Sequence, residues 1–221
     1  MAGFALTPQD RARVTAAVAE AERGTDGEIV TIVAAQSDSY HDVPLQFAVL
    51  AMLLVTALAT LEWRWLEIGV DPWGEPDFGH MLLMLLVVQA AVFLVVRYLV
   101  GWSRLRFALI PRATRRRRVR RRALQYFKVG AENRTHGRVG ILLYLSTRER
   151  MAEIVADEAI HGTVPAERWG DAMAALVAEV REGRSGDGMV AAVSAIGAIL
   201  SETFPKTADD VNELPDEVIE L

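Results

Sequence analysis

The chain has 221 residues, a net charge of −5 from 24 basic and 29 acidic side chains, and no Cys. The missing Cys excludes disulfides, iron–sulfur clusters, thiolate zinc sites and cysteine nucleophiles, and the composition excludes collagen-like and disordered classes. A mean hydropathy of +0.20 beside 24% charged residues predicts a strongly apolar segment joined to a polar globular part.

The first predicted elements are a helix over 7–23 and a strand over 29–35. Thr7 is a good N-cap, Pro8 suits the first helical position, and Asp10 stands where a capping-box acid belongs. Gly24 then ends the helix. The run IVTIVAA at 29–35 is rich in β-branched residues and predicts a buried strand.

Two uncharged apolar runs follow, at 45–61 and at 81–96, and the second extends to residue 100 through Arg97. A membrane-spanning helix needs about 17–25 mostly apolar residues, so both runs qualify. Two buried core helices of a soluble protein are the alternative. Trp and Tyr residues around the runs favour the membrane, because their rings prefer the membrane–water interface. We therefore expect a transmembrane hairpin over 45–100 with a loop at 62–80.

Charge sets the expected orientation of this hairpin. The loop 62–80 has five acids and one base, whereas residues 97–122 contain eleven Arg and no acid. Because Arg and Lys are retained on the cytoplasmic side, the loop should lie outside and both termini in the cytoplasm. The N-terminus has no cleavable signal peptide pattern. We expect a two-pass protein of the plasma (inner) membrane of a bacterium.

The Arg-rich juxtamembrane segment spans residues 101–122. A basic segment this close to a membrane is attracted to anionic lipids at about 1 kcal/mol per residue, which favours headgroup contact over nucleic acid. The Arg residues expected to contact headgroups are Arg115, Arg116, Arg117, Arg118, Arg120, Arg121 and Arg122.

The remaining elements read as one helix, two strands and two helices. A helix is expected over about 114–133, and strands over 139–145 and 151–156 are joined by a turn short enough to make them antiparallel. Pro165 should start the next helix at its first position, and Ser185 should cap the last one, which Pro205 ends. The tail 206–221 carries six acids and should be extended.

These elements predict an α/β fold with a small mixed sheet sandwiched by helices and interrupted by the two-helix hairpin. Residues 1–44 supply the first part of the cytoplasmic domain and residues 112–205 the second. The strands at 29–35 and 139–145 should be parallel.

Several stretches in order resemble the TPM domain family, in its membrane-protein branch: AVAEAERGTDGEIVTIVAAQSDSYHDVP, GRVGILLYLSTRERMAEIVADEAIHGTVPAERW, AIGAILSETFP and NELPDEVIEL. The resemblance implies an α/β/α sandwich and, for some soluble members, Ca²⁺ binding and phosphatase activity. Soluble members often have Asp-Asn-Gly and Leu-Pro-Asp where this chain has Arg138–Gly140 and Val164–Ala166, so two acids are missing.

The topology also predicts a polar edge of the sheet. The starts of the strands at 29–35 and 139–145 and the end of the strand at 151–156 should gather Glu28, Asp157 and Glu158 as candidate metal ligands, with His136 and His161 nearby. Solvated loop residues are the alternative interpretation. Within the hairpin, Gln89 is expected to bond to Thr56 or Thr60.

Two functions follow from this sequence. The first is a non-catalytic, membrane-tethered interaction or assembly module with an unknown protein partner, and with homo-oligomerisation as an option. The alternative is a membrane-anchored phosphatase that uses Ca²⁺. The missing acids and the lack of P-loop or nucleophile-elbow motifs favour the first.

Overall fold

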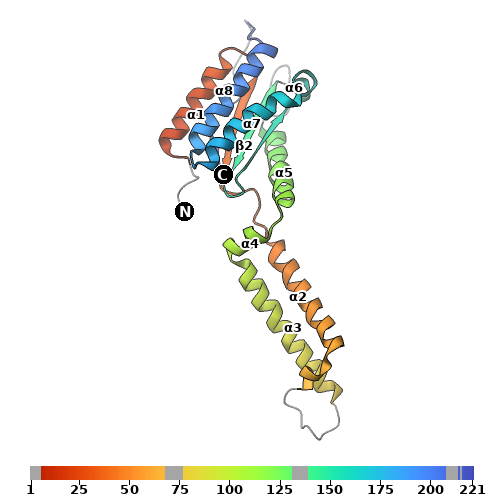
Figure 1. Ribbon diagram of the computed structural model, residues 1–221. Helices are drawn as coiled ribbons and strands as arrows, with labels where there is room; N and C mark the ends of the chain where they lie inside the picture. The colour runs from red at the N-terminus through yellow and green to blue at the C-terminus, as the bar shows by residue number, and fades with distance from the viewer. Residues whose placement is uncertain (1–5, 68–76, 131–138, 208–213, 215) are drawn as a thin grey trace. The chain divides into compact units, whose positions relative to one another are not determined.

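The computed structural model describes residues 6–67, 77–130, 139–207, 214 and 216–221 (Figure 1). The chain divides into two compact units. One contains the chain up to Asp38 together with Ala113–Leu221, and the other contains Ser39–Arg112. We call them the sheet domain and the hairpin.

The sheet domain is built on four strands in the order β3-β2-β1-β4: β1 (Glu28–Ala34), β2 (Gly140–Ser146), β3 (Met151–Ala156) and β4 (Ile219–Glu220). β1 and β2 are parallel, with Glu28 opposite Gly140, and β2 and β3 are antiparallel. Both predicted pairings are thus confirmed. β4, in the acidic tail, pairs in parallel with β1 and was not predicted.

Helices cover both faces of this sheet (Figure 1). On one face α1 (Pro8–Glu22), α7 (Ala166–Arg181) and α8 (Ser185–Thr203) enclose a core with Ile29, Ile141 and Leu143. On the other face α5 (Arg112–Gly130) packs Val119, Ala123 and Phe127 on Leu142 and Tyr144. The predicted sandwich of a mixed sheet between helices is confirmed. Alternation along β2 sends one set of side chains to each core.

The helix ends test the capping predictions one by one. Asp10 N–H donates to Thr7 Oγ1, and the Asp10 carboxylate accepts from Thr7 N–H, so the predicted capping box is present. The prediction for Ser185 was wrong: Arg184 is the N-cap of α8, and Ser185 Oγ is buried without a hydrogen-bond partner in the described part of the chain. Pro165 likewise is the N-cap of α7 rather than its first residue.

Close packing explains why Ser185 is buried. A Cβ atom at Gly188 would lie 2.9 Å from Leu176 O, and one at Gly197 would lie 2.5 Å from Ala21 Cβ. Glycine lets α8 approach α7 and α1 at these two positions. The start of α8 is therefore drawn into the helical layer, away from the water that a capping Ser normally faces.

The hairpin consists of α2 (Asp42–Leu61), η1 (Trp63–Glu67), α3 (Phe78–Gly101) and the short α4 (Ser103–Leu109). α2 and α3 pack along each other and are long and apolar enough to span a membrane. Gln89 Nε2 donates to Thr56 Oγ1 at 2.7 Å, which confirms the predicted bond between the two helices. At one end a small cluster contains Tyr40, Val43, Val100 and Ile110.

Candidate functional site

The polar edge of the sheet lies where β1 and β2 begin and β3 ends. Asp157 follows β3 directly and is buried. Its Oδ2 accepts from Gly140 N–H at 3.0 Å, and its own N–H donates to Gly140 O at the same distance. Its carbonyl oxygen accepts from Ile160 and His161 N–H at the start of α6 (Glu158–Thr163). Asp157 therefore ties β2, β3 and α6 together.

A cavity of 300 Å³ opens beside Asp157. Glu158 and His161 on α6 line it together with Asp157, and Arg120 and Lys128 approach from α5. The structure thus brings three of the five predicted edge residues around one opening, with two cations facing them. A cavity with this lining can hold a small anionic group as readily as a cation.

Glu28 lies elsewhere on the same edge. It is buried at the start of β1, its N–H donates to Val139 O, and it is not among the residues that line the cavity. β2 lies between β1 and β3, so Glu28 is separated from Asp157 by the width of a strand.

Within the described residues, the side chains predicted to bind a metal do not form a group arranged around one point. No group of three or more His, Asp or Glu side chains in the described ranges is arranged to hold a metal ion. Glu28, Asp157 and Glu158 as Ca²⁺ ligands stay a prediction. His136, the remaining edge residue, lies outside the described residues.

Sequence reasoning missed Glu22 at the end of α1. It is 8% exposed, and its Oε1 accepts from Ile29 N–H at 2.7 Å, while Oε2 has no partner within the described ranges. Burial, helped by the neighbouring Glu28 and Asp216, raises the pKa of Glu22 to about 8, although the hydrogen bond from Ile29 N–H opposes the rise. The signal was present in the sequence, because Glu22 follows Val14 and Val18 at the helical spacing that marks the buried face.

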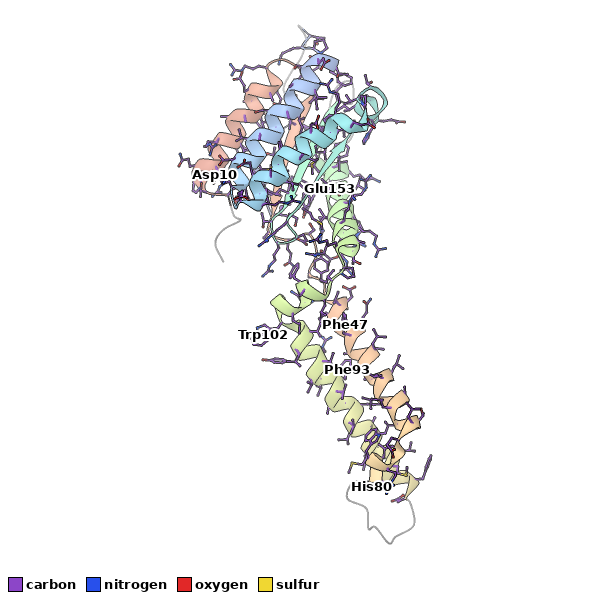
Figure 2. The ribbon with its side chains drawn as sticks, in the orientation of Figure 1. Asp10, Phe47, His80, Phe93, Trp102 and Glu153 are labelled. Carbon is purple, nitrogen blue, oxygen red and sulfur yellow. The ribbon has the colours of Figure 1, made fainter. Side chains whose placement is uncertain are left out.

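A second missed residue is Glu153, in the middle of β3 (Figure 2). Its carboxylate lies 3.6 Å from Arg120 and 3.9 Å from Arg116 on α5. Burial raises the pKa of Glu153, and the two guanidinium groups oppose that change. Alternation along β3 puts Glu153 on one face of the strand, and the packing of α5 on that face brings the two guanidinium groups to it.

The seven predicted headgroup-binding Arg residues have different surroundings. Arg118 and Arg121 pair with Asp38 at 3.1 and 3.4 Å, and Arg122 Nε donates to Ser37 O at 3.0 Å, so these three hold the segment after β1. Arg116 and Arg120 reach Glu153. Arg117 is exposed and has no ion pair within the described part of the chain, and the Nε of Arg115 is buried.

Fold and site together define an α/β sandwich domain with a polar strand edge and a basic helix, attached to an apolar hairpin. Residues 103–199 match the family model described as the TPM domain, so the chain contains a TPM domain. The predicted resemblance is confirmed over these residues, which run from α4 to α8.

One solved structure shares the fold. The NMR structure of the BA42 protein from the psychrophilic bacterium Bizionia argentinensis aligns with a TM-score of 0.57 at 17% identity, over 98% of this chain and 95% of that one. At this identity the likeness concerns the fold alone. A comparison with curated protein sequences found no match.

Proposed function

We propose that the protein is a membrane-tethered TPM module that binds a protein partner at the cytoplasmic face of a bacterial plasma membrane. The observation that carries the tether is the exposure of the hairpin. Large apolar side chains such as Leu50, Leu86 and Leu94 are 61%, 61% and 63% exposed. Contiguous apolar surface of this extent is costly in water and favourable in lipid.

Exposed Arg side chains of α5 support a role at the membrane surface. The side chains of Arg116 and Arg120 are 78% and 62% exposed, and Arg117 is exposed beside them. Anionic headgroups attract such residues when they lie within a Debye length of the bilayer. Of the seven Arg residues, these three are the ones whose surroundings best suit headgroup contact.

A role in binding a partner is favoured over catalysis, because the buried acids already accept backbone hydrogen bonds within the domain. The Asp157 carboxylate accepts from Gly140 N–H, and the Glu22 carboxylate accepts from Ile29 N–H. A catalytic acid needs to reach a substrate, whereas these carboxylates support the backbone of the sheet edge.

The proposal is tested by the topology of the chain in intact cells. Because the protein has no native Cys, Glu62→Cys and Glu217→Cys each introduce one thiol, both at exposed positions. An impermeant thiol reagent should label position 62 in intact cells and position 217 only after lysis. Labelling at 217 in intact cells overturns the orientation, and release of the protein by alkaline carbonate overturns the tether.

A phosphatase is the second candidate, favoured by the cavity where Glu158 and His161 face Arg120 and Lys128. The cations can hold a phosphate ester, and the acid and imidazole can exchange protons with it. The full chain should then hydrolyse p-nitrophenyl phosphate, and Glu158→Gln and His161→Ala should each slow turnover by about 100-fold or more. Glu167→Gln, exposed on α7, is the matched control. Equal turnover in all variants, or none in the wild type, removes this candidate.

A further inference from the structure

We infer that the open edge of β3 is a docking site for an extended, acidic segment of a partner protein, which adds to the sheet as a fifth strand. This inference rests on the proposed role as a binding module and assigns the surface and the chemistry of its partner.

The first observation is the unpaired side of β3. The sheet order is β3-β2-β1-β4, so β3 has a neighbour on one side only within the described residues. Asp157 N–H points to β2, where it donates to Gly140 O. Backbone groups alternate along a strand, so those of Ala152, Ile154 and Ala156 point away from β2. Such a row of donors and acceptors is a template for strand addition.

The second observation is that the edge lies along a groove rather than on a flat surface. A cavity of 510 Å³ is lined by β3 together with Arg116 and Arg120 of α5 and with Trp169, Met173 and Val177 of α7. It shares four lining residues with the smaller cavity near α6: Arg120, Ile154, Ala156 and His161. Helices thus stand on both sides of the open edge. An added strand would send alternate side chains toward α5 and toward α7.

The third observation is a buried donor in the larger cavity. Trp169 is 8% exposed and lines the cavity, and its Nε1 has no hydrogen-bond partner within the described part of the chain. Buried indole N–H groups nearly always have an acceptor. A carbonyl or carboxylate oxygen of a docked segment supplies one.

Charge identifies the occupant. Arg116 and Arg120 of α5 line the larger cavity, and among the described residues Glu153 is the one acid that lines it. Glu153 sits 3.6 and 3.9 Å from Arg120 and Arg116, so one carboxylate is shared by two guanidinium groups that remain well exposed. The excess of positive charge favours acidic side chains on the incoming strand. Met173, Val177 and Ile154 favour apolar residues at the alternate positions.

The experiment measures peptide binding to the full chain in nanodiscs of phosphatidylcholine, a neutral lipid that leaves the Arg residues available. The probe is a fluorescein-labelled eight-residue peptide that alternates glutamate and valine. We expect it to bind at least about tenfold more tightly than the same peptide with lysine in place of glutamate. N-methylation of alternate peptide bonds should abolish binding, because it removes the donors that pair with β3.

Variants of the chain locate the site. Arg116→Glu and Arg120→Glu should each weaken binding by about tenfold or more, and Trp169→Phe, which keeps the ring and loses the N–H, by about threefold or more. Arg117→Glu is the matched control, because Arg117 lies on the same helix, is exposed and lines neither cavity. Hydrogen exchange should slow at Ala152, Ile154 and Ala156 when the peptide binds.

Several results would overturn the inference. These are equal binding of the acidic and basic peptides, binding that survives N-methylation, an equal effect of Arg117→Glu, or hydrogen exchange at β3 that the peptide leaves unchanged. A dimer that excludes the peptide would make a second copy the occupant instead. Thiol labelling is independent of peptide binding. The expected labelling without peptide binding keeps the proposed tether and removes this docking site. Peptide binding with the opposite labelling keeps the docking site and removes the proposed orientation.

Discussion

The sheet domain and the hairpin are both rich in apolar residues, but the sheet domain buries them and the hairpin exposes them. All seven residues of β1 and all seven of β2 are buried. In α2 and α3, most Leu residues are exposed, among them Leu53, Leu86 and Leu94. The protein itself covers the strands, whereas the two helices stay exposed and are long and apolar enough to cross a membrane. Hydrophobicity alone therefore does not define a core. Whether an apolar segment is buried depends on what packs against it in the folded chain.

The sharpest way to break the comparison is to remove one apolar side chain from the sheet domain. Leu143 is fully buried between the sheet and the α1–α7–α8 layer. Leu143→Ala should lower the free energy of unfolding by about 2–5 kcal/mol, through lost burial and a residual cavity. Urea unfolding in detergent micelles, followed by Trp fluorescence, measures it. Val129→Ala, at a residue 75% exposed on α5, should change little; an equal loss in both would contradict the assigned core.

The corresponding change in the hairpin is a charge on its exposed face. Leu86→Arg should reduce stable membrane integration, because an Arg near the middle of a span costs about 2.5–3.5 kcal/mol on the insertion scale. The retained fraction after carbonate extraction measures the loss, and Leu86→Phe is the control. Were the hairpin to face water, Arg at this exposed position would be harmless. Unchanged retention of the variant would therefore count against a membrane span.

A buried acid in the sheet domain sharpens the comparison, since the two long hairpin helices carry few charges. The pKa of Glu22 is raised from 4.5 to about 8 in the folded chain. The folded state then holds a proton that the unfolded state releases, so stability should fall as the pH rises from 4.5 to about 8. Glu22→Gln keeps an acceptor for Ile29 N–H and should flatten this dependence, with a gain of about 1 kcal/mol at pH 8.

Unfolding midpoints between pH 4.5 and pH 9 test this prediction, and Glu20→Gln on the exposed face of α1 is the matched control. A wild-type profile that is flat over this range, or one that Glu22→Gln leaves unchanged, would show that Glu22 is ionised throughout.

The smallest expected effect concerns the polar contact within the hairpin. Gln89→Leu removes the 2.7 Å bond to Thr56 Oγ1 and should weaken the packing of α2 on α3 by about 0.6 kcal/mol. Forced unfolding or steric-trap measurements in bicelles resolve a change of this size. Thr60→Ala is the control, because Thr60 Oγ1 bonds to its own helix at Ala57 O. A larger effect from Thr60→Ala would show that Gln89 has another partner in the bilayer.

Much of the fold was predictable because its signals are local. Thr7 and Asp10 carry the capping box, the β-branched run gives β1, and the short turn after β2 requires an antiparallel β3. A partner for Gln89 across the hairpin was likewise predictable, because a polar side chain among apolar ones needs one, but the sequence left Thr56 and Thr60 open and only the structure selects Thr56. β4 was not predictable, since two residues of an acidic tail gain their strand conformation only by pairing with Ile32 and Val33.

The candidate site divides in the same way. The sequence by itself determined which polar residues end the strands and that Arg residues crowd one helix. Only the tertiary structure decided that the Asp157 carboxylate accepts a hydrogen bond from Gly140 N–H. It also decided that Arg118, Arg121 and Arg122 hold the segment after β1. Finally, it placed Glu153 within reach of Arg116 and Arg120. The physical reason is that propensity and periodicity act over a few residues, whereas burial and charge pairing depend on neighbours brought together from distant parts of the chain.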